Sequence, residues 1–329
     1  FTGQHDELVR DAIEFFQIKI DHRLKMMNAG QSLNQLLIQG LSQLENIFND
    51  GKQRDAVIIQ GDTTTVLAAG LVAFSMKIPV AHVEAGLRSY DLDHPFPEEG
   101  NRQLVSRIST WHFAPTEQSK QNLLLENIPS DAITVTGNTV VDAVYLGRDL
   151  IHQQRTQPNQ RQQQGLNFPT DARVILITAH RRENFGEGIQ NICNAVEYLA
   201  HQHANVHFVW PVHLNPAVHD VVYAQFAAHA QIHLVQPLDY PSLLAVIDRA
   251  EFILTDSGGI QEESPSFHKP VLILRETTER PEVVAVGAGI LVGTDQEKIV
   301  REAERLLTDQ GHYTAMAHAP NPFGDGKAS

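Results

Sequence analysis

The sequence predicts an α/β fold with two parallel sheets. Short apolar runs, too short for helices, recur along the whole chain and alternate with polar or amphipathic segments. This alternation is interrupted once, by a polar stretch over residues 152–165, and then begins again. With 329 residues, 42% of them hydrophobic, the chain is long enough to bury two cores.

The first half of the chain shows the alternation clearly. Residues 33–48 carry leucine, isoleucine and phenylalanine at helical spacing and are predicted to form a helix. Four strands are predicted, at residues 56–60, 79–83, 111–114 and 132–136. Strands alternating with helices are typical of βαβ units in a parallel, doubly wound sheet.

The second half repeats the pattern after a segment rich in glutamine, arginine and proline. This segment is either a surface helix end followed by a loop or, as we favour, a linker between two domains, because a second strand–helix series starts directly after it. Its predicted strands are residues 174–178, 206–210, 232–235, 252–255, 271–274 and 290–292. We therefore predict two Rossmann-like domains, with residues 1–150 in the first, a linker over 151–172 and residues 173–329 in the second. Ligands of such sheets bind at the carboxyl ends of the strands, so the domains are expected to face each other across a cleft.

Charge and composition exclude several functions. With 25 basic and 39 acidic residues, the net charge is −14, which argues against nucleic acid as a partner. One cysteine, Cys193, cannot form an internal disulfide, which favours the cytoplasm. No apolar run approaches the roughly 18–20 residues needed to span a membrane. Dinucleotide, Walker A and metal-ligand motifs are absent from the sequence, so we expect no cofactor and no metal.

Two acids follow predicted strands in the first half. Asp62 follows 56–60, and Glu84 follows 79–83. A carboxylate at the end of an apolar strand needs a partner or a chemical role. The alternatives are that Asp62 or a neighbouring threonine caps the next helix, and that Glu84 forms a buried pair with Arg88 or Arg102.

A third acid, Glu98, lies close in sequence to the other two. It follows Pro97, which is predicted to be the first residue of a helix. Acids in a first helical turn are ordinary helix-start chemistry, and that reading stays open for Glu98. Its weight as a candidate comes from being a third acid close in sequence to Asp62 and Glu84.

In the second half, three basic residues follow the strand at 174–178. His180, Arg181 and Arg182 at the carboxyl end of a strand would suit a pyrophosphate or a departing anion. The alternative is an exposed basic loop.

The segment 254–263 is the most specific signal. A strand ends, Ser257, Gly258 and Gly259 follow, and a helix begins with free backbone N–H groups, as a phosphate site requires. Glu263, one turn later, is a candidate for holding ribose hydroxyls, and Arg280, after the next strand, for contacting phosphate or nucleotide. The alternatives are a simple tight turn and a surface salt bridge.

These segments together resemble the UDP-N-acetylglucosamine 2-epimerase family, in its bacterial non-hydrolysing form. The resemblance covers nearly the whole chain and is carried, in order, by TGQH, GDTTT, HVEAGLRS, FPEEGNR, TGNTVVDA, TAHRREN, PVHLNP, LTDSGGIQEE, TTERPE and NPFGDGKAS. It implies a glycosyltransferase-B-like fold with the active site in the cleft between two Rossmann-like domains.

The resemblance also implies an isomerase that interconverts UDP-GlcNAc and UDP-ManNAc. In this family UDP is eliminated in anti fashion to give 2-acetamidoglucal, and UDP adds back after C2 is protonated on its other face. No cofactor or metal takes part. A cytoplasmic homodimer, bound to neither membrane nor nucleic acid, is expected.

The resemblance assigns roles to particular residues. Asp62 and Glu98 are expected to carry the protons, Glu84 to orient or assist, and His180 to neutralise the diphosphate. The residues expected to bind UDP are Ser257, Gly258, Gly259, Glu263, Arg280 and Leu243.

There are departures from the family pattern. We expect the chain to lack the family's first βα unit, whose arginine contacts substrate, and its last helix. Leu243 stands where relatives often have a phenylalanine beside the uracil, which removes the stacking face.

Some bacterial relatives bind a second UDP-GlcNAc as an activator. The positions that resemble that allosteric site are Gln4, Gln31, Arg181 and His213. Gly30 and Glu7 depart from it, since relatives have arginine and glutamine there.

Three other functions remain open from the sequence. A hydrolysing epimerase would release ManNAc and UDP. A UDP-sugar glycosyltransferase of the same fold would show similar phosphate-binding glycines, and a non-catalytic protein would only bind the UDP-sugar.

Overall fold

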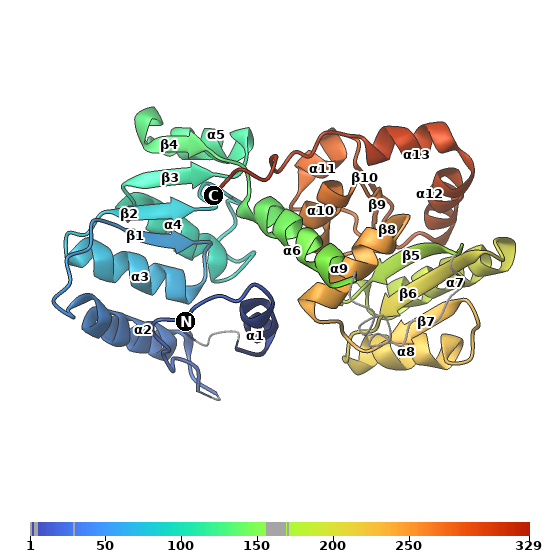
Figure 1. The fold of residues 1–329 in the computed structure, drawn as a ribbon, viewed down its shortest axis with the longest axis horizontal. Coiled ribbons are helices and arrows are strands. Elements are labelled where there is room, and N and C mark those ends of the chain that lie inside the picture. Colours follow the sequence, from blue (N-terminus) through green and yellow to red (C-terminus); the bar gives the residue numbers. More distant parts are fainter. Residues whose placement is uncertain (1, 3–5, 29, 156–168, 170) are drawn as a thin grey trace. The chain divides into compact units, whose positions relative to one another are not determined.

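The computed structural model describes residues 2, 6–28, 30–155, 169 and 171–329. The chain divides into two compact units (Figure 1). Unit 1 comprises Phe1–Asp142 and Phe323–Ser329, and unit 2 comprises Ala143–Pro322. Each unit contains one parallel sheet with helices, which confirms the predicted α/β fold.

Unit 1 is built on a four-stranded parallel sheet in the order β1-β2-β3-β4. The strands are β1 (Val57–Gln60), β2 (Val80–Val83), β3 (Trp111–Ala114) and β4 (Ile133–Val135). Because all four run in the same direction, their carboxyl ends lie along one edge of the sheet. This edge carries two of the three acids predicted from the sequence, Asp62 and Glu84.

The helices of unit 1 begin where the sequence supplies capping residues. Ser32 and Gln35 form a reciprocal capping box at the start of α2, and Thr116 caps α5. The helices are α1 (Asp6–Phe15), α2 (Leu33–Phe48), α3 (Thr64–Ser75), α4 (Glu98–Ile108) and α5 (Glu117–Leu125), with a 3-10 turn η1 (Ser130–Ala132). The long helix α6 (Thr139–Arg155) begins in unit 1 and continues into unit 2.

Unit 2 is built on a six-stranded parallel sheet in the order β10-β9-β8-β5-β6-β7. The strands are β5 (Arg173–Thr178), β6 (Val206–Pro211), β7 (Ile232–Val235), β8 (Phe252–Thr255), β9 (Val271–Ile273) and β10 (Gly289–Leu291). The order changes direction between β5 and β8, and ligands of open α/β sheets bind beside such a switch point.

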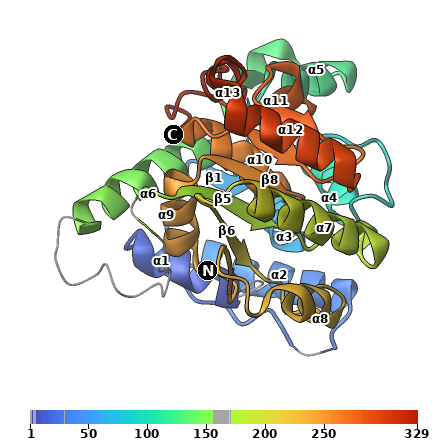
Figure 2. The same ribbon diagram turned by 90° about the vertical axis from the view of Figure 1, so that its right-hand side faces the viewer.

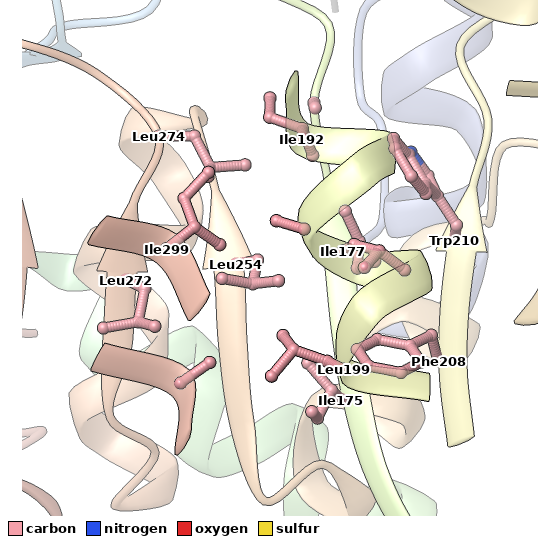
Figure 3. Close-up of a cluster of buried hydrophobic side chains, with 14 of the residues drawn as sticks. Ile175, Ile177, Ile192, Leu199, Phe208, Trp210, Leu254, Leu272, Leu274 and Ile299 are labelled. Atoms are coloured by element: carbon pink, nitrogen blue, oxygen red, sulfur yellow. The ribbon is translucent and has the colours of Figure 1, made fainter. Parts of the chain in front are cut away.

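Helices cover this sheet on both faces (Figure 2). They are α7 (Glu187–Gln202), α8 (Pro216–Phe226), α9 (Tyr240–Arg249), α10 (Gly258–Glu263), α11 (Pro281–Ala285), α12 (Gln296–Thr308) and α13 (Gln310–Ala317), with 3-10 turns η2 (Arg182–Asn184) and η3 (Ser264–Phe267). Figure 3 shows Ile192 and Leu199 of α7 against Ile177 and Phe208 of the strands, in the main core of unit 2. This core fixes the strand ends that carry the second half of the predicted site.

The predicted strands are present, with small shifts at their ends. The strand predicted at 290–292 begins one residue earlier, at Gly289. Pro97 is the N-cap of α4 and not its first helical residue, which corrects the prediction. The chain crosses between the units at Asp142 and Ala143, inside α6, and most of the predicted linker over 151–172 lies outside the described residues. The linker therefore remains a prediction.

Among the described residues, no helix is both long and apolar enough to cross a bilayer.

Candidate active site

Two of the predicted acids lie together at the carboxyl edge of the unit 1 sheet. The backbone N–H of Gly61, just before Asp62, donates to Val83 O, just before Glu84, at 3.1 Å. A Cβ atom on Gly61 would lie 3.9 Å from Glu84 Oε2. Glu84 has φ +65°, a left-handed conformation that costs free energy for a residue other than glycine and is concentrated at functional sites.

Asp62 is held by α4. Arg102 Nη2 donates to Asp62 Oδ2 at 2.6 Å, and Asn101 Nδ2 donates to Asp62 O at 2.9 Å. The N-cap of the following helix α3 is Thr63, which makes no side-chain capping bond. Neither Asp62 nor Thr63 therefore serves as a side-chain cap here, and the carboxylate of Asp62 is oriented by an arginine instead.

The arginines suggested as partners of Glu84 pair elsewhere. Arg88, whose side chain is fully buried, contacts Glu126 through Nε at 2.5 Å and through Nη2 at 2.9 Å. Arg102 contacts Asp62 and, at 3.4 Å, Glu99. Within the part of the chain that the structure describes, neither arginine forms an ion pair with Glu84, so the alternative that Glu84 is the buried partner of one of them is not supported.

Glu98 is the first residue of α4 and is partly buried. Its neighbour Glu99 is fully buried and accepts backbone N–H bonds from Ser89 at 2.9 Å and Tyr90 at 3.2 Å. The loop after Glu84 is thus tied to the helix start that carries Glu98. The role of Glu98 stays a prediction.

A buried histidine, His82, contacts the backbone just before Asp62. His82 Nε2 lies 2.8 Å from Gly61 O, and because a carbonyl only accepts, Nε2 must carry the proton. Burial lowers the pKa of His82 to about 4, against the smaller opposing effect of this hydrogen bond. His82 is therefore neutral at physiological pH and acts as a fixed hydrogen-bond donor.

In unit 2, the carboxyl ends of β5 and β8 meet at one buried carboxylate. Thr178 and Thr255 are register partners on these strands, and Asp256 follows Thr255. Asp256 is fully buried. Its Oδ2 accepts from the backbone N–H groups of His180 and Arg181, both at 2.8 Å, and from Asn184 Nδ2 at 3.0 Å.

The second oxygen of Asp256 faces the imidazole of His180, with Nδ1 3.2 Å from Oδ1. His213 stacks on the same ring, with centroids 5.8 Å apart and planes at 19°. Burial lowers the pKa of His180, the carboxylate of Asp256 opposes this, and His213 and Arg181 lower it further. The free protein therefore holds His180 largely neutral at pH 7.

The start of α10 has the features of a phosphate site. Ser257 is its N-cap and makes no side-chain capping bond, so the first N–H groups of the helix are not capped by Ser257. A Cβ atom on Gly258 would lie 4.0 Å from Arg181 Nη2. A guanidinium therefore lies close to the first turn of this helix, an arrangement that suits an anion, although the backbone N–H of Ser257 itself donates to Thr255 Oγ1 at 3.0 Å.

The expected ribose-binding acid lies at the end of α10. Glu263 is buried and hydrogen-bonds with Tyr240 of α9. Burial raises the pKa of Glu263 to about 7, the bond with Tyr240 lowers it, and Glu262 raises it further. Leu243, expected beside the base, is partly buried in the first turn of α9, close in sequence to Tyr240.

Arg280 forms an ion pair with Glu262, with both side chains mostly buried. The salt-bridge alternative is thus present, although not on an open surface. Thr278 supports the same loop, because its hydroxyl donates to Gln261 and accepts the backbone N–H of Arg280. The arginine is held near α10, where it could contact a nucleotide.

Comparisons with known proteins agree on one family. The family model for UDP-N-acetylglucosamine 2-epimerase matches residues 1–329. The chain is 46% identical to the UDP-N-acetylglucosamine 2-epimerase of Neisseria meningitidis, covering 100% of this chain and 88% of the relative. It is 46% identical to that of Escherichia coli K12, covering 99% and 87%.

A crystal structure of the Neisseria meningitidis UDP-GlcNAc 2-epimerase bound to UDP-GlcNAc superimposes with a TM-score of 0.85 at 45% identity, covering 99% of this chain and 88% of that one. This chain belongs to the UDP-N-acetylglucosamine 2-epimerase family. The family predicted from the motifs is thereby confirmed.

Several supporting residues of this epimerase-family chain were missed from its sequence. Asp256 lies inside the TDSGG segment, but the glycines drew attention to phosphate binding. His82 lies inside the strand predicted at 79–83, and Tyr240 lies in none of the predicted elements. A polar side chain at or next to the end of an apolar strand was the available signal for His82 and Asp256.

The positions compared with an allosteric site in the epimerase family are only partly described. Gln4 lies outside the described residues. Gln31 Nε2 donates to Met26 O at 2.8 Å in unit 1. Arg181 and His213 both lie beside His180 in unit 2.

The described residues contain no group of three or more metal-binding side chains.

Proposed function

We propose that this chain interconverts UDP-GlcNAc and UDP-ManNAc without net hydrolysis. The observation that carries the proposal is the division of chemistry between the units. Unit 1 brings carboxylates to the ends of adjacent strands, one of them in a left-handed backbone. Unit 2 gathers His180, Arg181 and the uncapped start of α10 at the ends of its own strands.

Direct removal of the C2 proton of the sugar would be very slow, because no carbonyl activates that position. We propose that one carboxylate takes the C2 proton while the C1–O bond breaks and its electron pair leaves with UDP. A C1=C2 double bond then forms in 2-acetamidoglucal. A proton delivered to the other face of C2, with UDP attacking C1, completes the isomerisation.

Asp62 and Glu98 are proposed to move these protons, and Glu84 to orient the sugar or assist. Positioned acid/base groups contribute about 10²–10⁴-fold to rate. Arg102 fixes the direction of the Asp62 carboxylate, which general base or acid chemistry requires.

Unit 2 is proposed to hold UDP and stabilise the charge that develops on it. His180 faces the diphosphate, Ser257, Gly258 and Gly259 donate backbone N–H groups, and Glu263 accepts from ribose. Arg280 and Leu243 are proposed to contact the nucleotide.

Proton NMR in deuterated water tests the proposal. Incubation with UDP-GlcNAc should replace the C2 proton by deuterium and produce UDP-ManNAc. Asp62→Asn and Glu98→Gln should slow the exchange at least about 100-fold. Asp131→Asn, which alters an exposed carboxylate of the same unit, should leave the exchange unchanged.

Other products would contradict the proposal. Free ManNAc would indicate a hydrolysing epimerase, and release of UDP that depends on a sugar acceptor would indicate a glycosyltransferase. Binding of UDP-GlcNAc by calorimetry with neither exchange nor UDP release would indicate a binding protein.

We also propose that the enzyme works in the cytoplasm as a homodimer. A second UDP-GlcNAc is proposed to bind as an activator, at Gln4, Gln31, Arg181 and His213. The single cysteine, Cys193, is buried, and burial raises the pKa of its thiol to about 12, so it is poorly reactive. Light scattering would give the oligomeric state. A hyperbolic rate curve with UDP-ManNAc, without added UDP-GlcNAc, would exclude obligatory activation.

A further inference from the structure

Asp256 stands apart from the other acids of unit 2 because both its oxygens face the segment that carries His180. It is fully buried at the end of β8, between β5 and β9. The other ends of its interactions are one backbone segment, residues 180–184, and one imidazole. Asp256 therefore acts on the segment that carries His180.

The two oxygens have different partners. Oδ2 accepts three N–H donors, from His180, Arg181 and Asn184, all within 3.0 Å. Among the described residues Oδ1 has no aligned hydrogen bond, although His180 Nδ1 lies 3.2 Å away. Such contacts often tighten when substrate binds.

We propose that Asp256 is a positioning residue for His180, fixing its backbone through Oδ2 and its Nδ1–H through Oδ1, so that Nε2 is presented to the diphosphate. This role rests on the proposed function of His180. An ionised carboxylate only accepts, so it selects the tautomer with the proton on Nδ1. The carboxylate also stabilises the imidazolium that forms when the diphosphate binds beside His180. An aspartate behind a catalytic histidine acts in the same way.

The other charged groups around the ring make this anchor necessary. His213 stacks on His180, and Arg181 follows it in the chain, and both disfavour a positive charge on the imidazole. Burial disfavours it as well. The carboxylate of Asp256 favours the positive charge, so its own charge decides how readily His180 gains a proton on binding UDP.

Asp256→Asn is a near-isosteric test. An asparagine whose oxygen takes the place of Oδ2 keeps all three N–H bonds, while its NH₂ group takes the place of Oδ1. That NH₂ group offers a donor to Nδ1, which must then be an acceptor. The backbone role is retained, and the imidazole is switched to the Nε2–H tautomer and loses its counter-charge.

The first measurement is nitrogen-15 NMR of the histidines, with the His180 signal assigned from the His180→Gln protein. Neutral His180 should carry its proton on Nδ1 in the unaltered chain and on Nε2 in Asp256→Asn, with a lower titration midpoint. Asn184→Ala, which removes one donor to Oδ2 only, should keep the Nδ1 tautomer. A proton on Nε2 in the unaltered chain would overturn the proposal even if the variant failed to fold.

The second measurement is a double-mutant cycle on UDP binding by calorimetry. Asp256→Asn should weaken UDP about tenfold, as expected for losing a bond to a charged group. In a His180→Gln background the same substitution should have almost no further effect. An equal loss in both backgrounds would show that Asp256 acts only on the fold.

These results separate the proposal from the proposed function. The tautomer and the binding cycle need no turnover, so a chain that shows both but does not exchange C2 would keep the Asp256–His180 pair and lose the epimerase. If the chain is an active epimerase but Asp256→Asn leaves the His180 tautomer unchanged, the proposed function is kept and the role of Asp256 is contradicted.

Discussion

At the scale of single residues, the ionisation of Glu263 should change the affinity for UDP-GlcNAc near neutral pH. Burial raises its pKa to about 7, so the carboxylate forms as pH rises through 7 and the neutral acid dominates below it. A carboxylate accepts ribose hydroxyls better than the neutral acid does. The affinity for UDP-GlcNAc contributed by Glu263 should fall up to about tenfold between pH 8 and pH 6, following the ionised fraction.

Calorimetry at pH 6, 7 and 8 would measure this effect, with Glu263→Gln as the control. UDP-GlcNAc is the suitable ligand because its diphosphate, unlike that of UDP, has no proton that titrates near pH 6. His180 titrates in both proteins, so the ratio of their affinities isolates Glu263. A ratio that does not change with pH would show that Glu263 does not bind ribose as a carboxylate.

Arg102 allows the role of Asp62 to be tested without altering the acid. Its guanidinium fixes the Asp62 carboxylate at 2.6 Å, and a misplacement of about 1 Å can cost about 100-fold in rate. Arg102→Gln should therefore slow C2 exchange by about that factor and leave UDP affinity, a property proposed for unit 2, unchanged. Arg107→Gln, on the same helix, is the control, since Arg107 contacts the Glu126 carbonyl instead.

The sequence identified the acids that follow strands, but not the residues that hold these acids in place. Asp62 and Glu84 follow predicted strands, so a parallel sheet brings them to one edge without further information. Arg102 reaches Asp62 from α4, 40 residues away, and that contact depends on how the helix packs. The contacts of Asp256 were not predicted, because the serine and glycines that follow it in sequence indicated a phosphate site.

At the scale of elements, Gly86 is required where β2 turns towards α5. It has φ +88°, and a Cβ atom there would lie 2.2 Å from Ser119 O, a backbone atom that cannot move aside cheaply. Gly86→Ala should destabilise unit 1 by about 3 kcal/mol or more, from overpacking and the left-handed backbone together. Gly100→Ala is the matched control, because nothing lies within 4 Å and a helical alanine should stabilise α4 by about 0.5–1 kcal/mol.

The two tryptophans give one reporter for each unit. Trp111 lies in β3 of unit 1 and Trp210 in β6 of unit 2, and the chain has no others. Fluorine NMR of a 5-fluorotryptophan-labelled chain would follow urea unfolding of each unit separately. An unchanged Trp111 transition in Gly86→Ala would contradict the packing argument.

Strands β2 and β3 carry a buried histidine pair, His82 and His112, which are register partners. Burial lowers the pKa of each to about 4 from an ordinary value of 6.5. The unfolded chain therefore binds more protons than the folded chain between these values. The stability of unit 1 should fall as pH drops from 6.5 to 4, by up to about 1.4 kcal/mol per pH unit for each histidine, and level off below.

The Trp111 signal would measure this slope by urea unfolding at several pH values between 6.5 and 4. His112→Gln removes one titrating group and should remove about half of the slope that the pair contributes. An identical slope in the variant would mean that acid weakens unit 1 through other groups.

Elements were more predictable than their ends. Helix α2 matches the prediction because its apolar spacing and its Ser32 cap give the same boundary. The start of α4 was misplaced because proline is common as a first helical residue, whereas here Pro97 has ψ 8° and lies one position before the helix. Such a choice between two backbone conformations depends on the contacts of the preceding loop.

At the scale of the whole molecule, the chain leaves unit 1 in α6 and returns to it at Phe323. The returning segment, residues 323–329, docks on unit 1 through several contacts. Phe323 is buried, and its carbonyl accepts from Asn138 N at 2.6 Å. The carboxylate of Asp142 accepts from the backbone N–H groups of Ala328 and Ser329 and from the Ser329 hydroxyl.

Because residues 323–329 dock on unit 1, a substitution in this last segment of the sequence should weaken a unit that is otherwise built from residues 1–142. Phe323→Ala should lower the stability of unit 1 by about 3–5 kcal/mol, the cost of emptying a buried phenylalanine site, and leave unit 2 almost unchanged. In the fluorine experiment the Trp111 transition should move to lower urea while the Trp210 transition stays in place. Asp142→Asn should shift Trp111 in the same direction but less, because it weakens hydrogen bonds and removes no packing. A shift of Trp210 alone would mean that residues 323–329 stabilise unit 2 instead, as their place in the sequence suggests.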